Sequence, residues 1–186
     1  ADCNTAVGLG ALSANTTANN NTAVGKNALT ANTTGFDNTA VGKDSLKANT
    51  TSRDNLALGM CALNANTTGS RNTASGSLAL DSNTTACDNT ATGYKALYAN
   101  TTGGCNTAVG RDALLALTTG STNVAVGRCT AINLTTGSNI LALGDFAGSD
   151  SMVNFTATAA NTIALGNNNM TGSIIRVAWT VTSDLR

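Results

Sequence analysis

The 186-residue sequence contains no histidine and no proline, and only 3% of its residues are aromatic and 11% charged. Without histidine the commonest general base and metal ligand is missing, which argues against an enzyme or a metal centre. Disordered chains are usually rich in charge and proline, whereas 41% of the residues here are hydrophobic and regularly placed. The absences therefore favour an ordered protein with a thin core of Ala, Val and Leu.

Charge and hydrophobicity exclude two further classes of partner. The net charge is zero and the basic residues are scattered, so no basic stripe could follow a phosphate backbone, and we expect no nucleic acid partner. Apolar runs are only a few residues long, so we expect no membrane insertion. The first residues lack a charged segment followed by an apolar one, and we expect any secretion signal to be absent or already removed.

The sequence repeats itself with a fixed period. The pentad NTAVG at residues 4–8 returns at residues 21, 38 and 106, with close variants between them. Its glycine serves as a marker that recurs at every seventeenth position without a slip. The marker glycines are Gly8, Gly25, Gly42, Gly59, Gly76, Gly93, Gly110, Gly127 and Gly144. Such a period indicates a solenoid or array.

Seventeen residues are too few for the paired helices of helical repeats, and turns rich in Asn, Thr and Gly form helices poorly. Two short strands fit better, one around TAVG and one around ALxA, with turns after the marker glycine and at NTTG. The prediction is an all-β fold, a β-solenoid or β-roll with one repeat per coil. Nine coils stacked at about 4.8 Å would form a rod on the order of 40 Å long.

The rhythm changes toward the C-terminus. A tenth marker, Gly166, follows Gly144 after a longer interval than the regular period, so five residues are inserted. We expect a regular roll over residues 1–148, an irregular final coil over 149–173 and a C-terminal strand over 174–186. That strand holds the only tryptophan, Trp179, which we expect to pack between chains.

Stacked coils place identical residues in rows. The asparagine before each strand should form a ladder of joined amides, and the marker glycine should supply a positive φ or room for close backbone approach. Adjacent residues of a strand face opposite sides, yet Ala6 and Val7 and their equivalents are both apolar. We expect Val7, Leu12 and their equivalents to be buried, and the second apolar row to hold a parallel homotrimer together, since such a stripe is rarely left exposed.

The five cysteines form no CxxC pair, and no metal or cofactor is expected. They are Cys3, Cys61, Cys87, Cys105 and Cys129. The simplest interpretation is that they are small buried or solvent-facing substitutions. Cys87 and Cys105 occupy nearly equivalent places in successive repeats, which leaves a disulfide between them open.

The NTT triplets allow three interpretations. They are N-glycosylation sequons, at Asn15, Asn32, Asn49, Asn66, Asn83 and Asn100. Glycans only about 5 Å apart would crowd each other, so we expect incomplete decoration or none, although a glycosylated extracellular filament remains an alternative. Two adjacent threonine rows would alternatively suit an ice-binding solenoid. Turn chemistry is the simplest interpretation, because Asn and Thr side chains bond nearby backbone groups.

The repeat NTAVGxxAL with a trailing ANTTG resembles the head β-rolls of trimeric autotransporter adhesins, and more closely the repeats of bacteriophage tail fibres, over residues 1 to about 148. The final VAWTVTSDLR resembles the entry to the intramolecular chaperone domain of tail fibres and tailspikes. This resemblance implies a self-cleavage junction beside Ser183, followed by Asp184 and Arg186. The lysine that the family pattern has next is not in this sequence.

The resemblance and the residues together predict a structural and host-attachment protein. We expect a rigid trimeric spacer in a viral tail fibre or surface adhesin, extracellular or on the virion, that contacts host-cell surface glycans or a receptor. Acidic residues sit at variable turn positions and show no recurring carboxylate pair, so we expect no enzyme and no catalytic residue apart from the Ser183 junction.

Overall fold

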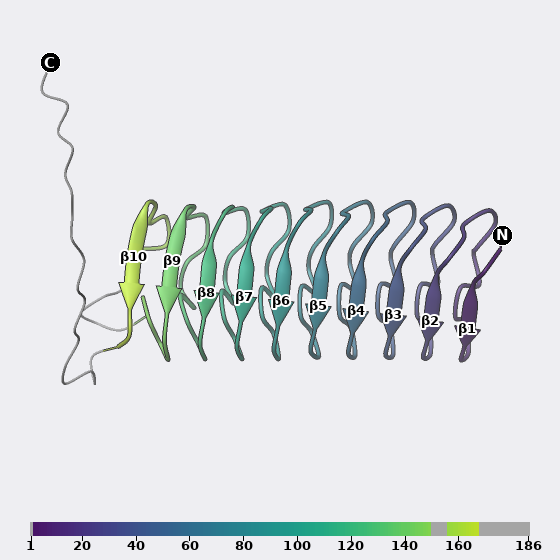
Figure 1. The fold of residues 1–186 in the computed structure, drawn as a ribbon, viewed down its shortest axis with the longest axis horizontal. Coiled ribbons are helices and arrows are strands. Elements are labelled where there is room, and N and C mark those ends of the chain that lie inside the picture. The colour runs from purple at the N-terminus through teal and green to yellow at the C-terminus, as the bar shows by residue number, and fades with distance from the viewer. Residues whose placement is uncertain (1, 150–155, 168–186) are drawn as a thin grey trace, which may run out of the picture.

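The computed structural model describes residues 2–149 and 156–167, which form ten short strands in one parallel sheet (Figure 1). Neighbouring strands follow one another in chain order from β1 to β10. The strands are β1 (Thr5–Val7), β2 (Thr22–Val24), β3 (Thr39–Val41), β4 (Leu56–Leu58), β5 (Thr73–Ser75), β6 (Thr90–Thr92), β7 (Thr107–Val109), β8 (Val124–Val126), β9 (Ile140–Leu143) and β10 (Thr162–Leu165).

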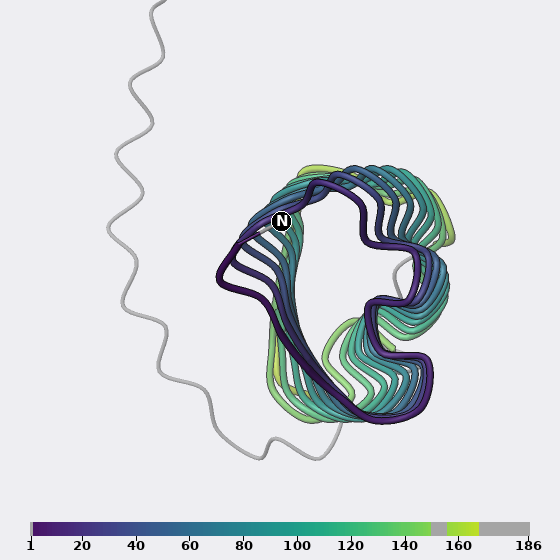
Figure 2. The ribbon, with the colours of Figure 1, turned by 90° about the vertical axis from the view of Figure 1, so that its right-hand side faces the viewer.

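Each coil lies on the next with its turns superposed, as the view along the stack shows (Figure 2). Strand partners lie one full repeat apart in the sequence from β1 to β9, as in the pairing of Ala40 with Ala57. The predicted all-β solenoid is thus confirmed, and the described residues contain no helix that could cross a membrane. We number the coils from 1 to 9 by their marker glycines.

The marker glycines have the two properties expected of them. Their φ angles lie between 117° and 145°, a region that residues with a side chain rarely adopt. A Cβ atom at Gly59 would also lie 2.6 Å from the carbonyl carbon of Gly76 in the next coil. Both the turn and the close stacking therefore require glycine at this position.

The second strand predicted around ALxA does not form. The leucine of this segment has a left-handed backbone, with φ between 46° and 54° from Leu12 to Leu114, which a strand does not allow. Left-handed leucine costs about 1–2 kcal/mol, and burying the side chain offsets this with about 1.5–3 kcal/mol. Leu29 to Leu114 are fully buried, so a sharp corner rather than a strand drives each leucine inward.

The core contains alanine and leucine rather than valine. Ala23, Ala40 and the equivalent alanines of later strands are fully buried, whereas Val7 and Val41 are 57% and 38% exposed. The prediction that the Val7 row is buried is therefore wrong, while the one for the Leu12 row is confirmed. The interior between the strand and the leucine corner accepts only a small side chain, so the alanine faces inward and the larger neighbour faces solvent.

The sheet continues past the regular repeats. β10 pairs with β9 in register, with Ala164 opposite Ala142, although the chain between them is longer than one regular repeat. The extra residues therefore do not interrupt the strand stack. Residues 149–173, expected as an irregular final coil, include this tenth strand, and residues 168–186 lie outside the described part of the chain.

Candidate functional site

The outward side of the sheet is an uncharged surface, which we call the outer sheet face. It consists of the residues before and after the alanine of each strand. Its members are Thr5, Val7, Thr22, Val24, Thr39, Val41, Leu56, Leu58, Thr73, Ser75, Thr90, Thr92, Thr107, Val109, Val124, Val126, Leu141, Leu143, Ile163 and Leu165. All are threonine, serine or aliphatic, so along the whole sheet this face offers neither charge nor aromatic rings.

The outer sheet face becomes more apolar toward its C-terminal end. Strands β5 and β6 carry only threonine and serine there, whereas β8 to β10 carry Val, Leu and Ile. A groove of about 400 Å³ opens at this end. It is lined by Thr122, Val124, Asn139, Ile140, Leu141, Asn161, Thr162 and Ile163. Exposed aliphatic side chains thus concentrate at one end of the sheet.

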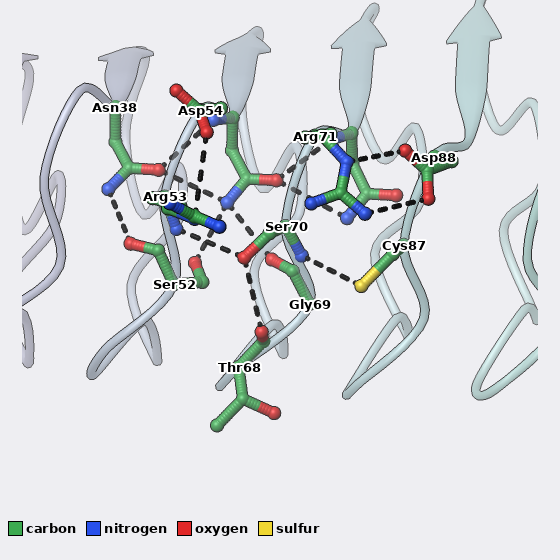
Figure 3. Close-up of polar contacts among 12 residues, drawn as sticks. Asn38, Ser52, Arg53, Asp54, Thr68, Gly69, Ser70, Arg71, Cys87 and Asp88 are labelled. Atoms are coloured by element: carbon green, nitrogen blue, oxygen red, sulfur yellow. Dashed lines mark hydrogen bonds and ion pairs between the residues drawn. The ribbon is translucent and has the colours of Figure 1, made fainter.

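The asparagines before β1 to β8 form the predicted ladder, here called the first ladder (Figure 3). The side-chain oxygen of Asn38 accepts a bond of 3.1 Å from the backbone N–H of Asn55 in the next coil. The amide of Asn38 also donates to the carbonyl of Ser52, near the end of the same coil, at 2.8 Å. The first ladder thus joins neighbouring coils and ties the start of each coil to its end.

The sequon asparagines form a second ladder inside the roll. Asn32, Asn49, Asn66, Asn83 and Asn100 are fully buried, and Asn15 in the first coil is half-buried. From Asn49 onward each amide nitrogen of this second ladder donates to the preceding asparagine oxygen, as from Asn83 to Asn66 at 2.8 Å. A glycan on such a nitrogen would have to occupy the closed interior, so the folded roll has no room for one at the five buried positions.

The two threonine rows have different environments. The first threonine of each triplet donates its hydroxyl to the next coil, as from Thr33 to the carbonyl of Thr50 at 3.1 Å. The second, such as Thr34 or Thr51, is exposed. The expected turn chemistry is present, and the two rows do not form one flat hydroxyl array.

Two ion pairs join neighbouring coils on the surface through two hydrogen bonds each. The guanidinium of Arg71 donates two bonds to the carboxylate of Asp88 in the next coil, at 2.7 and 3.0 Å (Figure 3). These bonds lower the pKa of Asp88 and raise that of Arg71. Arg128 makes a similar two-bond pair with Asp145 at 2.9 Å, on the turn after the marker glycines, and these bonds lower the pKa of Asp145. Such pairs stabilise charge rather than poise a group for proton transfer.

Two other carboxylates differ in their surroundings. A side-chain hydrogen bond from Asn27 lowers the pKa of Asp44, the largest of several causes. Partial burial instead raises the pKa of Asp81, against a weaker hydrogen bond to the Asn64 side chain. The two groups lie two coils apart, Asp44 in coil 3 and Asp81 in coil 5.

The cysteines are all free. The sulfur of Cys87 accepts from the backbone N–H of Ser70 in the preceding coil at 3.3 Å (Figure 3). Cys105 belongs to the following coil. The disulfide left open by the sequence is therefore not formed. Burial raises the pKa of the Cys61 thiol, which disfavours the reactive thiolate.

One surface cluster was not anticipated from the sequence. The rings of Tyr94 and Tyr98 both lie close to the Lys95 ammonium on the turn of coil 6. The available signal was simple, because these are the only two tyrosines of the chain and stand four residues apart. We call these three residues the tyrosine cluster.

Possible metal ligands do not cluster in the described part of the chain. In residues 2–149 and 156–167 no three Cys, Asp or Glu side chains come together as a metal site. Ser183, Asp184, Arg186 and Trp179 lie outside the described residues, so the self-cleavage junction stays a prediction.

Comparisons with known proteins add no family to these observations. No family model, curated protein or solved structure matches the chain. The geometry itself identifies a parallel β-solenoid built from coils of one repeat each.

Proposed function

We propose that this chain is a segment of a structural and host-attachment fibre, a viral tail fibre or surface adhesin, in which three parallel copies form a rigid extracellular spacer. The observation that carries the proposal is the outer sheet face, which runs the length of the sheet without a charge. Soluble monomers rarely expose so long a surface bearing Val, Leu and Ile. Interfaces between subunits have this composition, depleted in charge at their centre.

The repeat makes such an assembly self-consistent. Every coil presents its outer sheet face in the same direction, because consecutive strands pair in register. Three copies around an axis would therefore bury the same face at every level, and a cyclic arrangement leaves no face of this kind open. The groove beside β8 to β10 would be covered at the most apolar level.

Sedimentation velocity at micromolar concentration tests the assembly. We expect a particle of three times 18.5 kDa. Val41→Asp should give folded monomers, because Val41 faces solvent within one chain but would carry an unpaired charge into the interface. Thr51→Asp, exposed but off the outer sheet face, is the matched control and should remain trimeric. A folded wild-type monomer would refute the trimer.

The predicted junction at Ser183 needs a separate test. The resemblance implies that a chaperone domain encoded after Arg186 would be released by cleavage beside Ser183. Expression of the complete reading frame, followed by intact mass of the products, should show cleavage at that site. Ser183→Ala should leave the chain uncut. Cleavage that persists in this variant would contradict the assigned role.

An ice-binding solenoid is the second candidate, favoured by one observation. Thr22 and Thr39 pair in register on the flat outer sheet face, as do Thr73, Thr90 and Thr107. Leu56 and Val124 interrupt this row, which weakens the match to a regular lattice. Thermal hysteresis of the purified chain decides between the candidates, and the fibre proposal expects none.

A further inference from the structure

The tyrosine cluster gathers both tyrosines of the chain around one ammonium group. The nitrogen of Lys95 lies 5.4 Å from the centre of the Tyr94 ring and 5.3 Å from that of Tyr98. Both distances are within the range of attraction between a cation and an aromatic face. Both rings are thus held close to one positive charge.

The roll does not need these rings for its own stability. In coil 5 their positions hold Ser77 and Asp81, and in coil 7 they hold Arg111 and Leu115. Tyr94 is 45% exposed and neither ring belongs to the buried core. Large aromatic surface is thus presented to solvent at one level of an otherwise aromatic-poor shaft.

The local charge leaves the ammonium open to an anion. Lys95 forms no ion pair within the described residues, whereas the carboxylate of Asp112 is paired with Arg111 at 3.5 Å. Arg111 follows Tyr94 in the next coil, where the backbone N–H of Asp112 donates to the Tyr94 carbonyl at 2.9 Å. Asp81 precedes Tyr98 by one coil, and burial raises the pKa of its carboxyl, which makes its charged form less favourable.

We propose that the tyrosine cluster binds carboxylate-bearing saccharides, such as the uronic acid units of surface polysaccharides. The C–H faces of a pyranose would pack on ring surface that Lys95 leaves free, and the sugar carboxylate would pair with the ammonium. This site rests on the proposed attachment function and names its ligand class.

The shape of the site favours a polymer over a small metabolite. Small-molecule sites are generally concave cavities that enclose most of the ligand, and the cluster instead lies on the outside of a turn. A polysaccharide can touch such a platform with one unit and gain strength from repeated contacts. A trimer would present three copies of the platform to the same polymer, so weak single contacts would add up.

Tyrosine-ring NMR provides a direct test. Ring-¹³C-tyrosine labelling gives signals from two residues only, because the chain has two tyrosines. A hyaluronan tetrasaccharide carries carboxylates, and chitotetraose is a neutral counterpart with the same N-acetylglucosamine unit. We expect both rings to shift with hyaluronan and its binding to weaken with salt. Equal shifts with both sugars would overturn the acidic class, and no shift with either would overturn the site.

Variants assign the contacts. Lys95→Met should weaken binding of the hyaluronan tetrasaccharide about tenfold, equivalent to about 1.4 kcal/mol. Tyr94→Leu should remove binding detectable by isothermal titration. Phe36→Leu is the matched control, since Phe36 is another exposed ring beside a cation, Arg53, and should bind as wild type. Unchanged affinity in Lys95→Met would contradict the proposal.

The outcome is independent of assembly. The cluster lies on the turn after β6 and not on the outer sheet face, so its variants should sediment as the wild type does. A trimer that ignores hyaluronan would overturn this site and leave the fibre proposal standing. A monomer whose tyrosine rings shift with hyaluronan would overturn the fibre proposal and leave this site standing.

Discussion

Two parts of the roll share one backbone but have different linings. In coils 2 to 6 the second ladder runs from Asn32 to Asn100, whereas coils 7 and 8 hold Leu117 and Leu134 at the same position. The left-handed corner is nevertheless kept, with φ of 54° at Leu97 and 52° at Leu114. The comparison teaches that the marker glycines and left-handed corners determine the path of the backbone in each coil. The side chain at the second-ladder position can then be either a hydrogen-bonded asparagine or an apolar leucine.

The change from asparagine to leucine between coils 6 and 7 leaves one buried acceptor without a hydrogen bond. The side-chain oxygen of Asn100 is the one buried side-chain polar atom without a hydrogen-bond partner among the described residues. Every earlier member of the second ladder from Asn32 accepts from the amide of the next coil, but Leu117 has no donor to offer. A ladder of this kind satisfies each member only through its neighbour, so any end that is not exposed leaves one acceptor unpaired.

The largest expected effect comes from giving coil 5 leucine at both ladder positions, whereas coils 7 and 8 carry leucine only at the second and keep Asn106 and Asn123 at the first. Asn72→Leu with Asn83→Leu should cost about 3 kcal/mol or more of unfolding free energy, because each orphaned buried group costs about 1–3 kcal/mol. Three groups are orphaned, namely the N–H of Asn89, the side-chain oxygen of Asn66 and the carbonyl of Ala86. Urea denaturation measures the loss, and hydrogen exchange should be fastest around coil 5. A neutral double variant would show that the linings are freely interchangeable.

The reverse exchange should cost less. Leu117→Asn loses apolar burial but supplies a donor to the Asn100 oxygen, so we expect a net loss of about 1 kcal/mol. Leu134→Asn is the matched control, since its preceding neighbour in the row is Leu117 and offers no acceptor. Thermal unfolding should show Leu134→Asn to be more damaging by about 1 kcal/mol. Equal losses would mean that the unpaired Asn100 oxygen contributes nothing.

A smaller effect is expected from the partly buried carboxylate of Asp81, which lies in the coils that the second ladder lines. Because the folded-state pKa of Asp81 is raised by burial, its carboxylate opposes folding above that pKa, and the opposition disappears on acidification. Asp81→Asn should therefore stabilise the protein at pH 7, by less than about 1 kcal/mol given solvent screening, and not at pH 3. Asp44→Asn is the contrasting control. The lowered pKa of Asp44 predicts a loss at pH 7 that disappears as the pH falls through its folded value.

The smallest effect should be the same in both regions. Arg71→Gln and Arg128→Gln each remove an exposed two-bond pair, one from the Asn-lined part and one from the Leu-lined part. The lowered pKa values of Asp88 and Asp145 give stability above their unfolded values that is lost as the pH falls through the folded ones. Melting curves should show small, equal losses that high salt removes. Unequal losses would mean that the lining affects the surface.

Much of this architecture follows from the sequence because a repeat constrains itself. The unbroken spacing predicts parallel register, and the recurring Asn4 and Gly8 positions predict the first ladder and the glycine turn. The pattern could not decide between Ala6 and Val7 as the inward row, since both are apolar. Only the width of the closed coil, which excludes valine from the inside, settles it. The rule that consecutive residues alternate still holds.

Other features were hidden by average preferences. Leucine rarely adopts a left-handed backbone, so the sequence around Leu29 predicts a strand rather than the corner that the structure contains. The sequon at Asn32 looks like a surface motif, yet the repetition that makes it conspicuous is also what lets the amides join inside. The tyrosine cluster lies at variable positions of the repeat, where the period gives no information about the residue.

The independence of each coil has a genetic consequence. Every coil contacts only its two neighbours, and the marker glycine and first-ladder asparagine are the same on both sides of most junctions. Recombination that removes the seventeen codons for residues 55–71 would join Asp54 to Asn72 and restore both, and the product should keep the circular dichroism spectrum of the parent. Duplication or loss of DNA repeats can therefore change the length of the shaft by whole coils, because each new junction uses the same glycine and asparagine contacts between coils.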